Sequence, residues 1–432
     1  MNGEKTRLMA RNFRRNFSLL QVCLICLILG PFTTLCLASS NIRLGIDYLQ
    51  DREFDILQNK RVGLLTHPAG VNSLGKSTVL TLHNASKVNL VALFGPEHGI
   101  YGDEKASVPV DDKIDHRTNL PVYSLYGKFR KPTSKMLGGL DCLVIDLQDV
   151  GVRCYTYISC MRYVMEACFE EGVEVVVLDR PNPLGGLKTA GPMIDSEWIS
   201  YVGAFPMPFV HGMTIAEIAL WSKQVPGVLK IEDKVRKKGK LTLVPMIGWK
   251  RNMTWPSTGL VWRPTSPNIP TLDSVAGYPM TGLGAQMGKF KHGIGTKYPF
   301  RLLTFDGKSP EELKRALESL NLKGLSYKIK QTSNASGKSV RGVYLVIQDW
   351  SIWRPTELAF AMMQLTARWQ EPSPFSTAKQ SEINLFNKHV GSSAWWKHIK
   401  TKGSEVDPGP FLLSWDAEVD AFSRKNKSYL LY

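Results

Sequence analysis

Clusters of polar side chains follow three apolar segments of the chain, and their residue types suit the cleavage of a glycosidic bond. The apolar segments are 90–94, 140–145 and 173–178. The polar residues that follow them are Glu97, His98, Asp146, Gln148, Asp149, Arg153, Tyr155, Tyr157, Asp179, Arg180 and Asn182. Glycosidic cleavage needs one carboxylic acid that protonates the leaving oxygen and a second that stabilises the sugar cation or activates water.

Glu97 is the candidate for the proton donor and acceptor. It follows a proline and precedes His98 and a glycine, a turn that would hold the carboxyl group in place yet open to a ligand. His98 is a second catalytic candidate beside it. Asp146 and Asp149 are candidates for the second carboxylate. Because both follow an expected strand, the alternative is that they cap turns or pair with Arg153.

Arginine and tyrosine side chains in the same clusters suit substrate binding. Arg153 and Arg180 could hold a carboxylate of the substrate through paired hydrogen bonds, and the alternative is an internal salt bridge. Tyr155 and Tyr157 could stack on a sugar ring, or pack inside the protein.

Apolar runs typical of buried strands alternate with a stretch of helical periodicity. The expected strands are 61–66, 90–94, 140–146 and 173–178, and the expected helix is 157–172. Such strands predict a parallel sheet covered on both faces, an α/β fold. In these sheets ligands bind at the carboxyl ends of the strands, which is where the polar clusters lie.

The C-terminal half alternates less regularly. Helices are expected at 214–223, 356–369 and 416–423, and strands at 241–245 and 343–347. Because a proline-rich loop at 205–208 interrupts the pattern, we place a domain boundary within 200–215. This divides the chain into domains 41–210 and 211–432.

Motifs of several other chemistries are missing. The sequence has no P-loop, no strand-borne GxGxxG, no HExxH and no GxSxG. We therefore expect no nucleotide cofactor. The spacing of His67, His98 and His211 favours no metal site.

The N-terminal residues 1–40 have the pattern of a secretory signal peptide. Basic residues 1–15 precede the apolar run 19–29, and small residues follow near Ala38. The alternative is an uncleaved N-terminal anchor. In either case we expect export to the periplasm or beyond. No later stretch has the length of a membrane span, so we expect no stable membrane span in the mature protein.

Removal of this segment changes the charge and the cysteine content. It holds five basic residues and one acid, so the formal net charge falls from +16 to +12. The remaining basic residues are scattered except at 234–240, and with export this argues against a nucleic-acid partner. The remaining cysteines, for which we favour buried free thiols over disulfides, are Cys142, Cys154, Cys160 and Cys168.

Several motifs resemble those of the exo-β-N-acetylmuramidase family of glycoside hydrolases. They are Arg61–Thr66 (RVGLLT), Leu93–Ile100 (LFGPEHGI), Leu120–Gly127 (LPVYSLYG), Arg130–Pro132 (RKP), Asp146–Ser159 (DLQDVGVRCYTYIS), Leu178–Gly186 (LDRPNPLGG) and His211–Thr214 (HGMT). The resemblance implies a Rossmann-like N-terminal domain and a smaller C-terminal α/β domain, with the active site in the cleft between them. It implies release of N-acetylmuramic acid from the non-reducing end of peptidoglycan fragments, with Glu97 catalytic and with Asn182 and His211 binding substrate. The lactyl carboxylate of this sugar would explain an arginine in the site.

A few positions depart from the pattern of that family. Within 282–296 the family's Glu is missing, and Ile294 stands where an Arg is expected. His67 replaces a usual Asn, and Tyr101 a usual Arg. A second hypothesis therefore stays open, a muropeptide-binding protein of the same fold with weak or no catalysis. Peptidoglycan fragments are the partner in both cases, and a homodimer is also compatible with the sequence.

Overall fold

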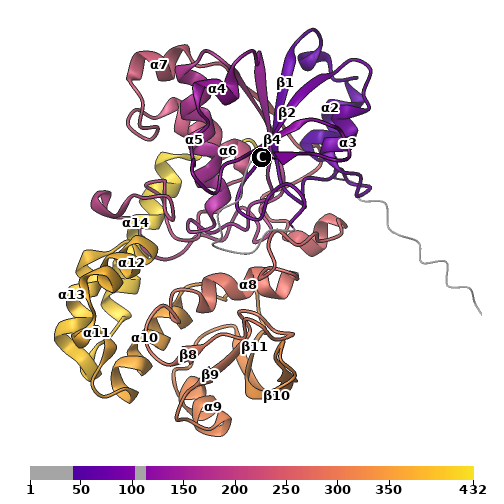
Figure 1. The fold of residues 1–432 in the computed structure, drawn as a ribbon. Coiled ribbons are helices and arrows are strands. Elements are labelled where there is room, and N and C mark those ends of the chain that lie inside the picture. Colours follow the sequence, from indigo (N-terminus) through magenta and orange to yellow (C-terminus); the bar gives the residue numbers. More distant parts are fainter. Residues whose placement is uncertain (1–41, 103–112) are drawn as a thin grey trace, which may run out of the picture. The chain divides into compact units, whose positions relative to one another are not determined.

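The structure, a computed structural model, describes residues 42–102 and 113–432 (Figure 1). The expected signal segment 1–40 lies outside the described residues. One sheet contains β1 (Arg61–Thr66), β2 (Asn89–Gly95), β3 (Lys113–Ile114), β4 (Pro121–Ser124), β5 (Cys142–Asp146), β6 (Glu174–Leu178) and β7 (Leu241–Val244). A second sheet contains β8 (Phe290–Lys291), β9 (Leu302–Phe305), β10 (Leu325–Ser333) and β11 (Ser339–Ile347).

The helices of the described residues fall into an earlier and a later group. Those that accompany the first sheet are α2 (Gly45–Asp51), α3 (Thr78–His83), α4 (Ser134–Leu137), α5 (Thr156–Glu170), α6 (Ile215–Gln224) and α7 (Asp233–Lys238). Those that follow are α8 (Leu272–Thr281), α9 (Pro310–Ser319), α10 (Glu357–Trp369), α11 (Pro374–Thr377), α12 (Gln380–Val390), α13 (Ser393–Lys402) and α14 (Gly409–Lys425). No helix in the described ranges is both long and apolar enough to cross a bilayer.

The seven-stranded sheet confirms the predicted α/β fold. Its order is β3-β4-β2-β1-β5-β6-β7, and every pair is parallel except β3 with β4. Leu65 of β1 is in register with Phe94 of β2 on one side and Ile145 of β5 on the other. The carboxyl ends of these three strands therefore lie in a row, and the loops after them leave the same edge of the sheet.

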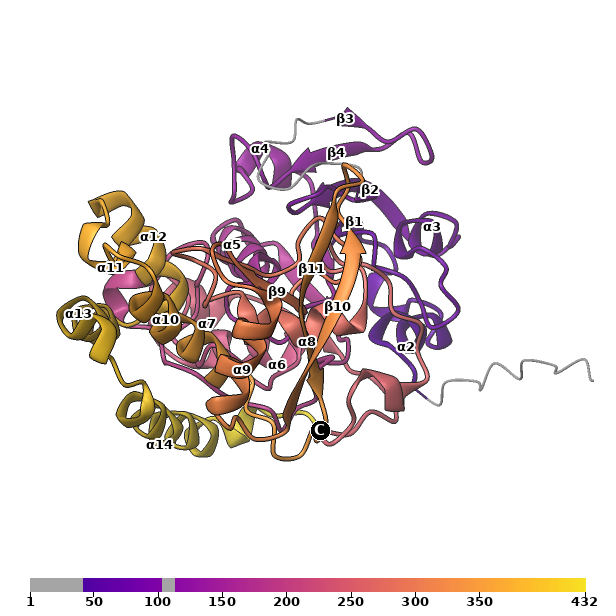
Figure 2. The ribbon, with the colours of Figure 1, turned by 90° about the horizontal axis from the view of Figure 1, so that it is seen from below.

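Both faces of this sheet are buried, which is why its strands are continuously apolar. Leu143 and Ile145 pack in one cluster with residues of α5 and α6, while Val144 packs in another with residues of α2 and α3. Figure 2 shows α2 and α3 on one side of β1 and β2, and α5 on the other. All four described cysteines are buried free thiols, which confirms that prediction.

The smaller second sheet is antiparallel, with the order β10-β11-β9-β8. Apolar residues of α8, α9 and α10 pack in one cluster with β9 and β11, and the aromatic rings of Phe360, Trp395 and Trp415 join α10, α13 and α14. This region supplies the second, smaller part of the predicted fold. The first sheet continues past residue 210, where the sequence suggested a boundary, because β7 pairs with β6.

The last residue of the chain is held against the first sheet. The Tyr432 hydroxyl donates to Asp179 Oδ2 at 2.7 Å and accepts from the backbone N–H of Met246 at 2.8 Å. Asp179, which follows β6, also accepts from Thr214 Oγ1 and from the N–H of Ala216. Burial raises the pKa of the Asp179 carboxyl to about 7 in spite of these donors.

We expect the raised pKa of Asp179 to make the protein less stable as pH rises from about 4 to about 7. In this interval the folded protein holds a proton that the unfolded chain has released. The free energy of unfolding then falls by at most about 1.4 kcal/mol per pH unit. Urea denaturation at a series of pH values should show this slope in the wild type and a flatter curve in Asp179→Asn. Equal slopes in the two proteins would contradict it.

Candidate active site

Glu97 lies in a tight turn at the carboxyl end of β2. The N–H of Gly99 donates to the carbonyl of Pro96 at 3.0 Å, and His98 and Gly99 both adopt left-handed backbone angles, with φ of 72° and 70°. A Cβ atom on Gly95 would approach the Gly99 Cα to 3.3 Å, so a larger residue there would crowd the turn. His98 is buried, whereas Glu97 is partly exposed. The turn therefore presents the carboxyl group of Glu97 at the sheet edge.

Residues at the N-terminus of α5 contact Glu97. Thr156 Oγ1 donates to Glu97 Oε2 at 3.2 Å, and the Tyr157 hydroxyl lies 3.4 Å from the Glu97 carbonyl oxygen and 2.6 Å from that of Thr265. No side chain caps this end of α5. The carboxyl group of Glu97 therefore lies at the amino-terminal end of α5, where Thr156 holds it.

Asp149 is held by two donors and has one oxygen without a partner. Its Oδ2 accepts from the N–H of Gly151 at 2.7 Å and lies 3.1 Å from His211 Nε2. Because the N–H of Met213 donates to His211 Nδ1 at 3.2 Å, the ring proton is on Nε2 and points to Asp149. Asp149 Oδ1 is buried and has no hydrogen-bond partner within the described ranges. The structure thus leaves this oxygen for a water molecule or a substrate hydroxyl.

Asp146 is fully buried, and both of its carboxylate oxygens accept hydrogen bonds. Arg180 forms two hydrogen bonds with it, Nε to Oδ1 at 2.5 Å and Nη2 to Oδ2 at 2.8 Å, and Thr78 Oγ1 donates at 2.5 Å. The ion pair foreseen as the alternative exists, but its cation is Arg180 where the sequence suggested Arg153. Arg180 Nη2 also donates to the carbonyl of Val71. The two residues lock neighbouring loops, and we keep Asp149 as the candidate for the second carboxylate.

Arg153 is fully buried among backbone carbonyls. Its Nη1 donates to Pro192 at 2.7 Å and Met207 at 2.9 Å, and its Nη2 donates to His389 at 3.2 Å and Val390 at 2.9 Å. Neither of the predicted roles, a contact with substrate carboxylate or an internal salt bridge, fits this arrangement. The guanidinium instead joins the loops that contain Pro192 and Met207 to the end of α12.

Asn182 also positions the backbone. Its side-chain N–H donates to the carbonyl of Met213 at 3.0 Å, and its oxygen accepts from the N–H of Leu184 at 3.0 Å. A side chain on Gly151 would approach the Asn182 oxygen to 2.5 Å. Asn182 is therefore packed against the loop that carries Asp149, and it holds this loop in position.

The two predicted tyrosines lie side by side near Glu97. Their ring centroids are 4.9 Å apart, and the Tyr155 hydroxyl donates to Thr265 Oγ1 at 2.6 Å. Burial raises the pKa of both phenols, so they stay protonated at neutral pH. Tyr278 of α8 meets Tyr155 edge-on with centroids 6.1 Å apart. Helix α8, which belongs to the C-terminal part of the chain, thus contributes an aromatic ring to the site.

His67 follows β1 and is neutral. Its Nε2 accepts from the N–H of Gln148 at 2.8 Å, and its ring packs edge-on against Tyr157 with centroids 4.7 Å apart. Burial lowers the pKa of His67 well below its usual value, and the nearby Arg180 lowers it further. Among the described residues, no group of three or more His, Cys, Asp or Glu side chains is arranged to hold a metal ion.

Two family models match the chain. The N-terminal domain of the exo-β-N-acetylmuramidase NamZ matches residues 62–273, and the C-terminal domain matches residues 276–432. The chain belongs to the NamZ family. Among curated proteins it is 38% identical over 396 residues to the peptidoglycan β-N-acetylmuramidase NamZ of Bacillus subtilis, covering 90% of this chain and 91% of that protein.

Solved structures of two proteins of Bacteroides fragilis, both titled as DUF1343 family proteins, share the NamZ-family fold of this chain. One is 36% identical with a TM-score of 0.81, and the other is 26% identical with a TM-score of 0.67. Each comparison covers 91% of this chain and 99% of the solved chain. The similarity therefore extends over both regions of the fold.

Within this NamZ-family site, sequence reasoning missed residues on three elements. They are Thr156 at the start of α5, Thr265 in the proline- and tryptophan-rich stretch, and Tyr278 in α8. Thr156 had a signal, since it stands between the two tyrosines of a conspicuous motif. Thr265 and Tyr278 had none, because only the folded chain brings them beside Tyr155 and Tyr157.

Proposed function

We propose that this protein is an exo-acting glycosidase that releases N-acetylmuramic acid from the non-reducing end of peptidoglycan fragments. The observation that supports this proposal most directly is the position of the Glu97 carboxyl group. It lies at the edge of the sheet and accepts a hydrogen bond from Thr156. The NamZ relative from Bacillus subtilis, named a peptidoglycan β-N-acetylmuramidase, supports the reaction and the substrate.

In the proposed reaction Glu97 acts as the general acid and base. It protonates the glycosidic oxygen as the bond to the anomeric carbon breaks, and later takes a proton from the incoming water. Asp149, with its unpartnered Oδ1, is the supporting carboxylate, and His211 fixes its orientation through Oδ2. Tyr155, which is partly exposed, offers apolar ring surface for the sugar, whereas Tyr157 is buried and packs beside it.

The exo mode is tested with two purified peptidoglycan oligosaccharides that differ only at the non-reducing end. We expect the protein to shorten the oligosaccharide that begins with N-acetylmuramic acid by one sugar. The oligosaccharide that begins with N-acetylglucosamine should stay intact. Chromatography with mass detection distinguishes the products, and cleavage inside either chain would contradict exo action.

The hydrogen bond from Thr156 should set the position of the Glu97 carboxyl group. We expect Thr156→Val to lower kcat about tenfold, the effect of losing one hydrogen bond, with a smaller change in KM. Thr156→Ser, which keeps the hydroxyl, is the matched control and should stay near the wild type. Steady-state assays with a chromogenic N-acetylmuramic acid glycoside measure both constants. An unchanged kcat in Thr156→Val would contradict the role of Thr156 in positioning Glu97.

A peptidoglycan substrate supports the proposal of export. Residues 1–40 have the sequence pattern of a signal peptide, and peptidoglycan lies outside the cytoplasm. Expression of the full chain in its host should yield mature protein whose N-terminus lies near residue 40. An intact N-terminus on protein recovered from the cytoplasm would contradict export.

A second candidate is a muropeptide-binding protein without turnover, favoured by the departure of segment 282–296 from the family pattern. Ile294, which stands where an Arg is expected, is 45% exposed in this segment. This candidate predicts binding of N-acetylmuramic acid disaccharide with no product after prolonged incubation. Turnover by the wild type would exclude it.

A further inference from the structure

Arg130 lies in the loop that follows β4, next to the loop that carries Glu97. Strand β4 is parallel to β2, with Ser124 in register with Gly95, and the N–H of Leu125 donates to the Gly95 carbonyl at 2.8 Å. The two loops therefore leave the sheet side by side at its carboxyl edge. Glu97 comes two residues after this point on one chain segment, and Arg130 six residues after it on the other.

The Arg130 guanidinium is held between two tyrosine rings. Its Cζ atom is 4.3 Å from the ring centroid of Tyr126 and 4.2 Å from that of Tyr201. Within the described ranges, Arg130 Nη1 and the Tyr201 hydroxyl are both buried without a hydrogen-bond partner. The hydroxyls of Tyr126 and Tyr201 interact with the guanidinium, but neither meets Nη1 in hydrogen-bonding geometry. Burying such a donor unpaired is costly, so this N–H indicates an acceptor that the described chain does not supply.

Helix α5 relates this pair of donors to the catalytic carboxyl group. Thr156 and Tyr163 lie on one face of α5 two turns apart, and Cys160 lies between them. Thr156 binds Glu97, and the Tyr163 ring meets the Tyr201 ring edge-on with centroids 5.4 Å apart. The donors thus lie beside the same helix as Glu97, about two turns further along it.

Other electrostatic contacts agree with this placement. Burial raises the pKa of the Cys160 thiol to about 12, while the neighbouring Tyr201 and Arg130 act in the opposite direction. Burial likewise raises the pKa of Tyr201, and Glu97 is among the charges that add to the shift. Tyr201 is therefore in the electrostatic reach of both Arg130 and Glu97.

We propose that Arg130, together with the Tyr201 hydroxyl, binds the lactyl carboxylate of N-acetylmuramic acid and so makes the enzyme prefer this sugar to N-acetylglucosamine. The two sugars differ by the lactyl ether, which carries the carboxylate. A guanidinium between two rings is shielded from water, which strengthens its hydrogen bonds to a carboxylate. The inference rests on the proposed function and names the residue that selects the substrate.

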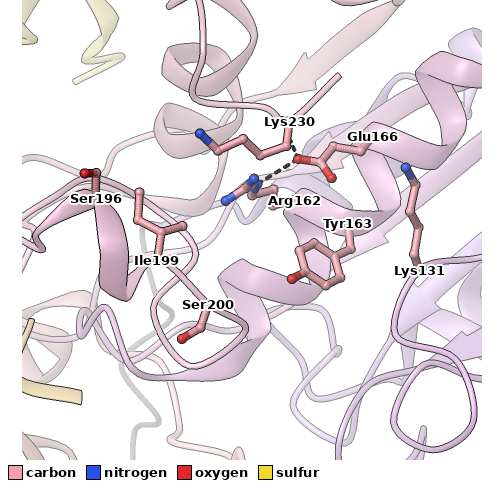
Figure 3. A pocket seen from close by; sticks show the side chains of 8 residues that line it. All are labelled: Lys131, Arg162, Tyr163, Glu166, Ser196, Ile199, Ser200 and Lys230. Carbon is pink, nitrogen blue, oxygen red and sulfur yellow. Dashed lines mark hydrogen bonds and ion pairs between the residues drawn. The ribbon is translucent and has the colours of Figure 1, made fainter. Parts of the chain in front are cut away.

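The other arginines predicted for this task are occupied, and a neighbouring pocket suits it less well. Arg153 and Arg180 are bound to carbonyls and to a carboxylate, as described above. The pocket in Figure 3, of about 340 Å³, is lined by Lys131, Arg162, Tyr163, Glu166, Ser196, Ile199, Ser200 and Lys230. Two of its three cations are already paired with carboxylates, Arg162 with Glu166 at 2.7 Å and Lys131 with Glu170 at 2.5 Å, and Lys230 Nζ donates to the Gly227 carbonyl at 3.2 Å.

The test compares two chromogenic substrates, the β-glycoside of N-acetylmuramic acid and the same glycoside with its lactyl carboxylate converted to an amide. We expect Arg130→Met to lower kcat/KM for the acid by about 10²-fold, as for loss of one partner of a desolvated charge pair. Its kcat/KM for the amide should change little. Arg130→Lys keeps the positive charge but lacks the planar guanidinium with its paired N–H donors. It should therefore retain more of the preference for the acid than Arg130→Met does.

Lys131→Met is the matched control, because it removes the adjacent positive charge, which lines the pocket of Figure 3. We expect it to keep the wild-type preference for the acid. A loss of preference in Lys131→Met with none in Arg130→Met would transfer the role to that pocket and overturn the proposal. Equal losses on acid and amide in Arg130→Met would also overturn it, since they indicate a general loss of the site.

Binding separates this inference from the proposed function. If the wild type releases no chromophore from either substrate, the proposed function fails, whereas calorimetry with free N-acetylmuramic acid still tests Arg130. We expect the Kd to rise about 10²-fold in Arg130→Met with an unchanged melting temperature. Equal Kd values for wild type and Arg130→Met would contradict the proposal.

Discussion

Replacing Glu97 by glutamine is expected to lower kcat for a chromogenic N-acetylmuramic acid glycoside by about 10³-fold. The amide keeps the shape of the side chain and can still accept from Thr156 Oγ1. It cannot give a proton to the leaving oxygen or take one from water. KM should change little, because the hydrogen-bonding surface offered to the substrate stays nearly the same.

The control for this variant is Glu53→Gln, which removes the same group from an exposed site where it pairs with Lys87. It should retain wild-type kcat. A chromogenic substrate with a good leaving group needs less acid assistance than a disaccharide does. The loss in Glu97→Gln should therefore be larger on the disaccharide. Undiminished turnover of both substrates by Glu97→Gln would refute the role of Glu97.

Replacing Arg153 by methionine is expected to lower the free energy of unfolding by about 3–5 kcal/mol. The guanidinium donates to four backbone carbonyls, and a methionine of similar length leaves those oxygens buried without donors. Two of the carbonyls belong to His389 and Val390, at the end of α12. The loss should therefore loosen the contact between that helix and the loops beside the site. Chemical denaturation measures the change.

Arg341→Met is the matched control for this loss. Arg341 forms a salt bridge with Glu311 on the surface, with both side chains more than two-fifths exposed. Its loss should leave the free energy of unfolding nearly unchanged. A similar small cost for Arg153→Met, combined with a selective rise in KM, would restore the direct contact with substrate that the sequence suggested.

The elements that position the site were predictable because their apolar patterns depend on burial alone. Strand β1 was expected at 61–66 and is found at Arg61–Thr66, since a buried parallel strand is apolar on both faces. Helix α5 was expected at 157–172 and is found at Thr156–Glu170, where Gly172 with φ of 74° follows its end. The sheet edge that carries Glu97 and Asp149 follows from these elements.

The partners of the site residues were not predictable in the same way. The sequence placed carboxylates and arginines in the same loops, but several pairings were open. Which arginine pairs with Asp146 depends on how loops 34 residues apart meet in the folded chain. Two of the four carbonyls that accept from Arg153 belong to residues more than 230 positions away in the sequence. Arg130 belongs to one of the family-like motifs, Arg130–Pro132, but its place between Tyr126 and Tyr201 was not predictable, because the two rings come from separate segments.

The most direct test of the central claim is incubation of the purified protein with the disaccharide in which N-acetylmuramic acid is β-linked to N-acetylglucosamine. Mass-resolved chromatography should show both free sugars in equal amounts with the wild type. The rate should fall by about 10³-fold or more with Glu97→Gln. Intact disaccharide after prolonged incubation with the folded wild-type protein would contradict the account.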